Sequence, residues 1–141
     1  MSGPSAHLSW DELACKDGTA YPAEWRLTRA VELAEVFEAI RAVCGHQSLT
    51  VLSAFRTPEH NRAIGGARHS QHVQGRALDL RPPTGWTVAR FHARIRELQP
   101  SLPLLRGIGR YVAAGFVHVD TRPSDRLVAW NGGDAQKDAT G

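Results

Sequence analysis

The sequence has few cysteines, no long apolar run and no cluster of like charge, and each shortage excludes a class of protein. Its two cysteines, Cys15 and Cys44, are too few for a disulfide framework and lack C-x-x-C spacing. They form either one bridge or two buried thiols. No apolar run approaches the roughly 20 residues that span a bilayer, so we expect no membrane partner. The basic residues are scattered, so the net charge of +3 predicts a solvated basic surface rather than a nucleic-acid partner.

The composition is that of a globular protein with one core. The chain has 141 residues, of which 42% are hydrophobic and 22% charged, typical of a single domain. We expect this monomeric domain to cover residues 1–130. Residues 131–141 are polar and glycine-rich, which predicts a disordered tail. The first five residues lack the charged-then-apolar layout of a secretory signal, so we expect the protein to be cytoplasmic until it is released.

Hydrophobic periodicity predicts helices that alternate with short strands. Apolar residues at three- and four-residue steps predict amphipathic helices over residues 25–43 and 87–98. Thr57-Pro58 is typical of a helix start. Short β-prone runs predict strands over residues 49–53, 76–81, 107–110 and 115–120. The fold class is therefore α+β, with helices packed on a small antiparallel sheet.

Two of the predicted strands carry acidic or imidazole side chains on one face. Alternation places Asp79 opposite its apolar neighbours, and His118 and Asp120 share one face of another strand. A carboxylate in an apolar strand is costly unless it is paired or bound to a metal. With His72 in the loop before Asp79, two nitrogens and one oxygen would form a three-ligand zinc set with an open fourth position. A buried Asp–His hydrogen-bonded pair is the alternative, and we interpret the histidines outside this region as surface or capping residues (His7, His46, His60 and His92).

The segment around His72 resembles a known signature. Residues 70–79 read Ser-x-His-x-x-Gly-x-Ala-x-Asp, which matches the S-x-H-x-x-G-x-A-x-D motif of the zinc D-Ala-D-Ala carboxypeptidase family. That family belongs with the LAS metallopeptidases, which include murein endopeptidases and phage endolysins and share the hedgehog zinc fold. Residues 53–61 resemble the family's S-x-x-R-[ST] segment, and residues 107–120 resemble the branch with a G-F-V-H-[VI]-D motif. Residues 7–18 resemble the opening of phage and prophage members.

The resemblance implies a metallopeptidase that acts on the bacterial cell wall. His72, Asp79 and His118 would bind Zn²⁺, and Arg56 would point into the cleft to bind substrate and stabilise developing negative charge. Ser70 would orient the loop of His72 or contact substrate. The implied reaction is hydrolysis of peptidoglycan stem peptides or cross-links by metal-activated water. Endopeptidase and carboxypeptidase both fit, as do a phage lysis protein, a virion enzyme and a prophage product.

One position departs from the family pattern. Many members carry Glu or Asp three residues before the second zinc histidine, as general base, and here that position is Gly115. Asp120 lies about 7 Å beyond His118 on the same strand face. It would serve as the base or, as we prefer, would orient a ligand histidine. His69 is another candidate for proton transfer. The missing acid leaves open a non-catalytic zinc module that binds the cell wall.

Overall fold

A five-stranded sheet forms the centre of the molecule. The structure, a computed structural model, describes residues 2–132. The sheet order is β1-β2-β4-β3-β5, in which β1, β2, β4 and β3 are antiparallel and β5 pairs parallel with β3. The strands are β1 (Thr50–Ser53), β2 (Ala77–Arg81), β3 (Gly107–Tyr111), β4 (Phe116–Asp120) and β5 (Val128–Asn131). The α+β class is confirmed, and the predicted antiparallel sheet is correct for four strands.

The fifth strand was not predicted. Val128–Asn131 is four residues long, and it pairs with a strand about twenty residues earlier in the chain. Its local pattern is too short to indicate a strand by itself. Because Asn131 ends β5, the first residue of the predicted tail is part of the sheet, and residues 133–141 lie outside the described residues. The division into a domain of residues 1–130 and a tail stays a prediction.

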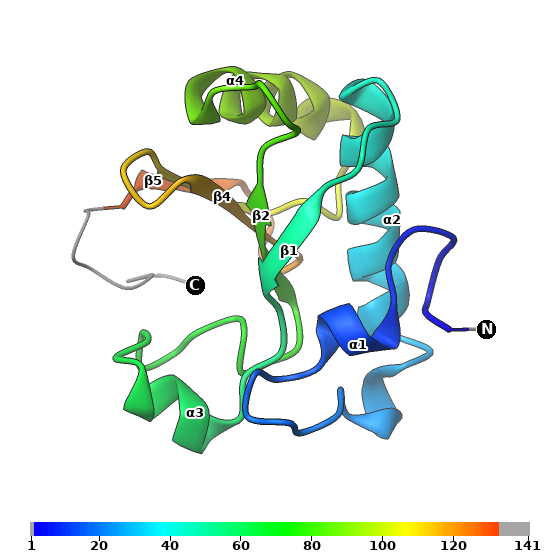
Figure 1. Cartoon of the computed structure of the whole chain (residues 1–141), viewed down its shortest axis with the longest axis vertical. Coiled ribbons are helices and arrows are strands. Elements are labelled where there is room, and N and C mark those ends of the chain that lie inside the picture. The colour runs from blue at the N-terminus through cyan, green and yellow to red at the C-terminus, as the bar shows by residue number, and fades with distance from the viewer. Residues whose placement is uncertain (1, 133–141) are drawn as a thin grey trace.

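The helices lie around the sheet (Figure 1). They are α1 (Trp10–Leu13), η1 (Ala23–Trp25), α2 (Arg29–Val43), α3 (Pro58–Ala63), α4 (Val88–Leu98) and η2 (Gln99–Ser101). The helix predicted over 25–43 is two elements, because Thr28 leaves helical geometry at φ −123° and ψ −88°. Thr57 and Thr87 cap α3 and α4 as side-chain acceptors. No helix among residues 2–132 is long and apolar enough to cross a membrane.

The apolar face of the sheet packs against α2 and α4. Leu78 and Leu80 of β2 and Val117 and Val119 of β4 are fully buried in one cluster with residues of both helices. Alternation sends the residues between them to the opposite face. The hydrophobic effect therefore fixes which face of the sheet carries Asp79, His118 and Asp120.

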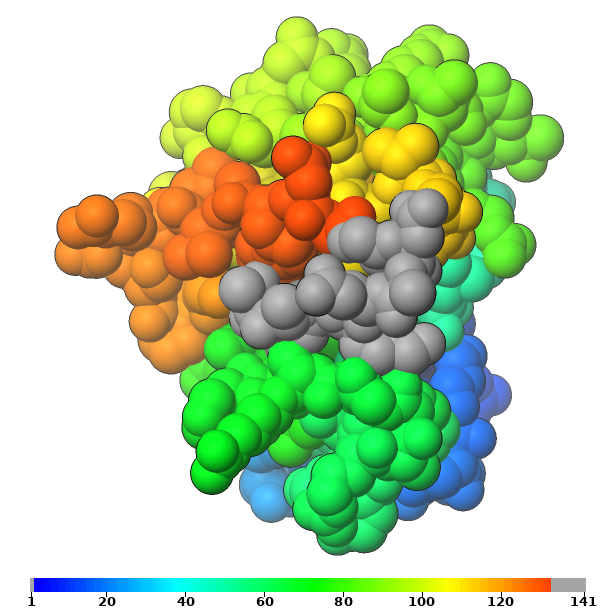
Figure 2. Space-filling model, turned by 90° about the vertical axis from the view of Figure 1, so that its left-hand side faces the viewer, coloured from blue at the N-terminus to red at the C-terminus, as the bar shows by residue number. Residues whose placement is uncertain are grey.

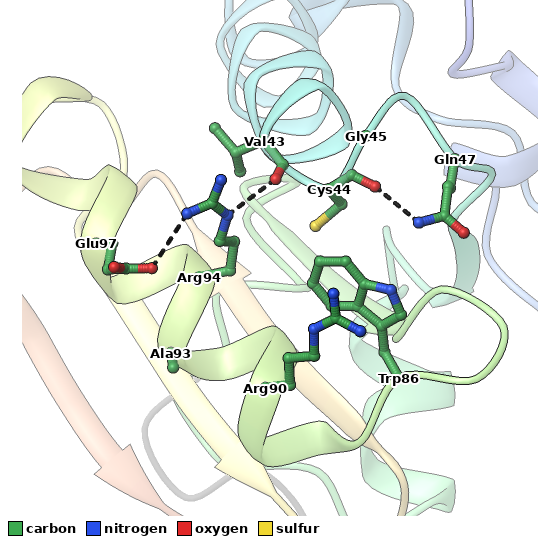
Figure 3. A pocket seen from close by; sticks show the side chains of 9 residues that line it. All are labelled: Val43, Cys44, Gly45, Gln47, Trp86, Arg90, Ala93, Arg94 and Glu97. Atoms are coloured by element: carbon green, nitrogen blue, oxygen red, sulfur yellow. Dashed lines mark hydrogen bonds and ion pairs between the residues drawn. The ribbon is translucent and has the colours of Figure 1, made fainter.

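The C-terminal end of α2 and one side of α4 border a hollow of about 570 Å³ (Figure 3). Arg94 donates from Nε to the carbonyl oxygen of Val43 at 3.0 Å, which satisfies a free carbonyl at the end of α2. Cys44 also lines this hollow. Cys15 and Cys44 are both buried and free, so the alternative of two buried thiols is confirmed.

The N-terminal segment is held to α2 through Glu38. Its carboxylate accepts hydrogen bonds from Ser5 Oγ at 2.6 Å and from the His7 backbone N–H at 2.9 Å. His7 Nδ1 lies 2.8 Å from the other carboxylate oxygen. Burial raises the pKa of Glu38, but the hydrogen bonds from Ser5 and His7 outweigh it and lower that pKa. This carboxylate therefore contributes to stability only while it is ionised.

Candidate metal centre

Three buried side chains from a loop and two strands meet on the polar face of the sheet. Asp79 of β2 lies directly across from His118 of β4, and His72 comes from the loop before β2. Asp79 Oδ1 lies 3.2 Å from His72 Nε2 and 3.0 Å from His118 Nδ1. The exposed fraction is 4% for Asp79 and 0% for both imidazoles. The structure thus brings together the three residues that the strand pattern and the family resemblance selected.

This face of the sheet lies on the side opposite α2, and Figure 2 views the molecule from there. Green residues of α3 and the loop after it form the lower part of the view. Orange residues that follow β4 lie above them. His72 lies in the chain between α3 and β2, and Asp79 and His118 lie in strands of the sheet itself.

Tight packing sets the path of the loop that carries His72. Ser70 is buried, and its Oγ accepts a hydrogen bond from the His72 backbone N–H at 3.1 Å. Gly75 has a φ of +68°, and a Cβ there would meet the Trp25 ring at 2.6 Å, so only glycine fits. Tyr21 donates to the Gly75 carbonyl oxygen at 2.7 Å. The Ser70 contact supports the loop-orienting alternative, and its contact with substrate stays a prediction.

The second ring nitrogen of each histidine is engaged by an acceptor. His72 Nδ1 lies 2.7 Å from the Ala54 carbonyl oxygen, which only accepts, so Nδ1 carries the hydrogen. His118 Nε2 lies 2.7 Å from Asp120 Oδ2 and donates to that carboxylate. The remaining nitrogen of each ring then presents a lone pair toward Asp79.

This arrangement needs positive charge at its centre. Two imidazole lone pairs and a carboxylate oxygen at 3.0–3.2 Å repel one another unless a proton or a metal cation lies between them. A tetrahedral zinc ion with bonds of 2.0–2.2 Å holds its ligand atoms roughly 3.4 Å apart, close to these separations. The donor types, their spacing and their anchored second nitrogens fit Zn²⁺.

The pKa of Asp79 lies well below its usual range. Burial alone would raise this pKa, but the neighbouring His72 and His118 outweigh burial and lower it. Arg56 adds a further positive charge, with Nη2 3.4 Å from Asp79 Oδ2. Asp79 is therefore ionised at neutral pH, as a metal ligand must be.

Asp120 is enclosed by hydrogen-bond donors. Besides His118, it accepts from Arg122 through the backbone N–H at 3.1 Å, Nε at 2.9 Å and Nη2 at 2.6 Å. It is fully buried against Gly107, where any Cβ would collide with the carboxylate. Burial raises its pKa, but the hydrogen bonds from Arg122 and His118 lower it below the usual range. These contacts support the orienting role that we preferred over that of general base.

Arg56 lies beside the three candidate ligands. Its guanidinium also donates to Asn61 Oδ1 at 3.2 Å and to Ser53 Oγ at 3.1 Å, and the residue is 6% exposed. These bonds aim the positive charge at the carboxylate oxygen of Asp79 that does not face the histidines. Its role toward substrate stays a prediction.

The remaining candidate for proton transfer, His69, and the position that departs from the family pattern, Gly115, lie away from the three candidate ligands. His69 is exposed and lines a hollow of about 410 Å³ with Arg29, Arg68 and Arg76. Gly115 lies in the turn between β3 and β4 with a φ of +84°, a conformation that strains Glu or Asp. Of residues 2–132, Asp79 and Asp120 are the buried carboxylates.

Sequence reasoning missed Trp130 of β5. Its ring centroid lies 5.2 Å from that of His118, and its Nε1 donates to Tyr111 Oη at 2.9 Å. The indole lies over Gly109, where a Cβ would meet it at 2.6 Å. The available signal was Gly109, because a glycine within a strand often marks the close approach of another group. That signal does not identify Trp130 as the group.

Comparison with known proteins identifies the family. Residues 6–120, which include all three candidate ligands, match the family model described as peptidase M15. The chain belongs to the peptidase M15 family. The M15 membership confirms the peptidase resemblance drawn from the signature. The phage-like branch stays a prediction.

A curated protein is also similar to this M15 chain. It is named probable peptidoglycan L,D-endopeptidase MepK, from Haemophilus influenzae, and is 28% identical over 93 residues. The aligned part covers 66% of this chain and 43% of that protein. The M15 chain therefore spans less than half the length of this relative.

Proposed function

We propose that this M15 chain is a zinc-dependent peptidase that hydrolyses peptide bonds in peptidoglycan stem peptides or cross-links. The observation that carries the proposal is the convergence of His72, Asp79 and His118, with each outer ring nitrogen engaged by an acceptor. Three protein ligands leave one of four tetrahedral positions open, as in catalytic zinc sites. The family membership supports the peptidase activity.

When bound, Zn²⁺ supplies a Lewis acid that polarises a carbonyl and activates water. The chain's own residues then divide the remaining work. Arg56, beside Asp79, donates to the scissile carbonyl oxygen as negative charge develops. Asp120 and the Ala54 carbonyl hold the two imidazoles in the orientation that binding needs. Ser70 keeps the loop of His72 in place.

The relative's name and the chain's charge support the choice of substrate. The relative is named as a peptidoglycan L,D-endopeptidase, which favours endopeptidase cleavage of a bond between L- and D-residues. The net charge of +3 suits an anionic wall polymer. We further propose a monomer that reaches the wall on phage lysis or as part of a virion.

Digestion of sacculi tests this function. Purified protein is incubated with sacculi, alone, with a chelator, and with Zn²⁺ restored, and released muropeptides are identified by mass spectrometry. We expect release that the chelator abolishes and zinc restores, and none from the His118→Ala variant. His92→Ala, which alters a half-buried histidine of α4 outside the cluster, is the matched control and should keep full activity. Release that persists in His118→Ala contradicts the proposed site.

A non-catalytic zinc module that binds the wall is the second candidate. The observation in its favour is Gly115, which stands where many family members carry the acidic base. Such a module would bind zinc through His72, Asp79 and His118 and sediment with sacculi, yet release no muropeptide. Defined muropeptides as substrates then separate the enzyme from the module, and their product masses separate endopeptidase from carboxypeptidase.

A further inference from the structure

Three side chains from two separate segments meet beside α3, and none of them belongs to the metal centre described above. Cys15 and Asp17 lie in the loop after α1, and His60 lies in the first turn of α3. A ligand atom from each, sulfur, carboxylate oxygen and imidazole nitrogen, lies within 4.8 Å of the other two. Figure 1 shows the chain after α1 passing beside the start of α3. The segments that meet here are therefore more than forty positions apart in sequence.

Hydrogen bonds hold the Asp17 carboxylate at this meeting point. Thr19 donates its backbone N–H to Asp17 Oδ1 at 2.9 Å, and Thr57 donates its hydroxyl to Oδ2 at 2.9 Å. The same Thr57 hydroxyl accepts from the His60 backbone N–H at 3.1 Å. Thr57 therefore fixes Asp17 and His60 relative to each other, through contacts that do not involve the imidazole.

The loop itself is closed and the carboxylate is charged. Cys15 donates its N–H to the Thr19 carbonyl oxygen at 2.8 Å, and Gly18 donates to that of Cys15 at 3.0 Å. The pKa of Asp17 lies below its usual range, first because of the Thr19 backbone N–H and then because of the Thr19, Cys15 and Thr57 side chains. A negative charge is therefore present next to the thiol at neutral pH.

We propose that Cys15, Asp17 and His60 form a second metal site that takes Zn²⁺. Thiolate sulfur with imidazole nitrogen selects zinc over Mg²⁺ or Ca²⁺, which prefer oxygen ligands. Zinc bonds of 2.0–2.3 Å place tetrahedral ligand atoms roughly 3.4–3.6 Å apart. The separations of the ligand atoms, all within 4.8 Å, therefore need to shorten by at most about 1.4 Å on binding. Cys15 is buried and Asp17 is exposed, so solvent supplies the fourth ligand from the open side.

Binding has a defined proton balance and a structural consequence. The Cys15 thiol releases one proton as the sulfur–zinc bond forms, while Asp17 is already ionised and neutral His60 binds through a lone pair. The ion then ties the loop after α1 to α3. Asn61 of α3 accepts a hydrogen bond from Arg56, which lies beside the first site. An ion bound at the second site would therefore stabilise the position of Arg56 without contributing a ligand to the first site.

Cobalt substitution tests the second site independently of peptidase activity. Tag-free protein is loaded with Co²⁺, desalted, and examined for metal content and for the near-ultraviolet band that only cobalt–thiolate bonds produce. We expect two metal ions per chain and a thiolate band. His118→Ala should lose one ion and keep the band, because the first site contains no sulfur. The second site can therefore be confirmed even if the first site binds no metal.

Variants of the cluster decide the assignment. Cys15→Ser should lose the band and one ion, whereas Cys44→Ser, the matched control with the other buried thiol, should keep both. If Cys15→Ser does not fold, the exposed Asp17→Asn variant serves instead and should weaken the second ion at least tenfold. A wild-type chain without the thiolate band, or a band that survives Cys15→Ser or disappears in Cys44→Ser, overturns the proposal.

Discussion

Replacement of Asp120 separates an orienting carboxylate from a general base. If Asp120 orients His118, Asp120→Ala removes the carboxylate that accepts a hydrogen bond from His118 Nε2. The Nε2–Oδ2 distance of that bond is 2.7 Å. The imidazole then loses its fixed tautomer and its aim at Asp79. Asp120→Asn keeps the shape and one acceptor oxygen, but its NH₂ group faces the donors of Arg122. We therefore expect the alanine variant to be the more damaged in metal binding.

The size of the effect follows from the contacts. Loss of an outer carboxylate that orients a ligand histidine costs about 10–100-fold in metal affinity, or about 1.4–2.7 kcal/mol. Asp120 is also the fully buried partner of Arg122, whose side chain is 13% exposed. Removing one partner of such a buried pair costs about 3 kcal/mol of folding stability. Asp120→Ala should thus lower both zinc affinity and the free energy of unfolding.

Zinc affinity measured by chelator competition, together with chemical unfolding, checks this prediction. Asp125→Ala is the matched control, because Asp125 lies five residues away with its side chain 91% exposed. It should change neither quantity by more than about 0.5 kcal/mol. If Asp120→Ala binds zinc as tightly as the wild type, the orienting role is refuted. If Asp120→Asn binds zinc normally but turnover collapses, Asp120 is the base.

Three further changes test other parts of the structure. Gly75→Ala should lower the free energy of unfolding, measured by urea titration, by more than about 2 kcal/mol, because the new Cβ collides with an aromatic ring. Gly85→Ala is the control, because Gly85 also has a positive φ but open space around it, and this variant should cost about 1 kcal/mol. Glu38→Gln should cost about 1 kcal/mol at pH 7. The pKa of Glu38 is lowered in the fold, so its contribution is fully present above the unfolded pKa. The difference from wild type should shrink as pH falls through the folded pKa and vanish below it, as unfolding measured across pH would show. Arg56→Lys should reduce kcat/KM on a defined muropeptide by about 10²-fold or more while zinc stays bound, and unchanged turnover would remove Arg56 from catalysis.

The faces of the strands were predictable because side chains alternate along a strand. Leu78 and Leu80 are apolar, so the core must lie on their side, and Asp79 must then face away from it. The same reasoning placed His118 and Asp120 together, and the structure confirms that shared face. Apolar spacing likewise predicted helices over 25–43 and 87–98, and the structure has α2 over 29–43 and α4 over 88–98.

Contacts between distant segments could not be derived from local pattern. Which residue of β4 lies across from Asp79 depends on register, which the whole sheet sets. The tautomer of His72 depends on the carbonyl of Ala54, a backbone atom with no signature in sequence. Trp130 reaches His118 only because β5 pairs with β3.

His60 is the clearest example of a residue whose contacts only the tertiary structure reveals. On its helix it has the pattern of a surface histidine, and nothing near it in sequence indicates a ligand. The loop of Cys15 and Asp17 lies next to it because Thr57 bonds to that loop across forty positions. Local periodicity, which short-range sterics and solvent impose, was thus enough to orient the strands and helices that the sequence predicted. The chemistry at both clusters arose from folding, because long-range packing alone brings such side chains within bonding distance.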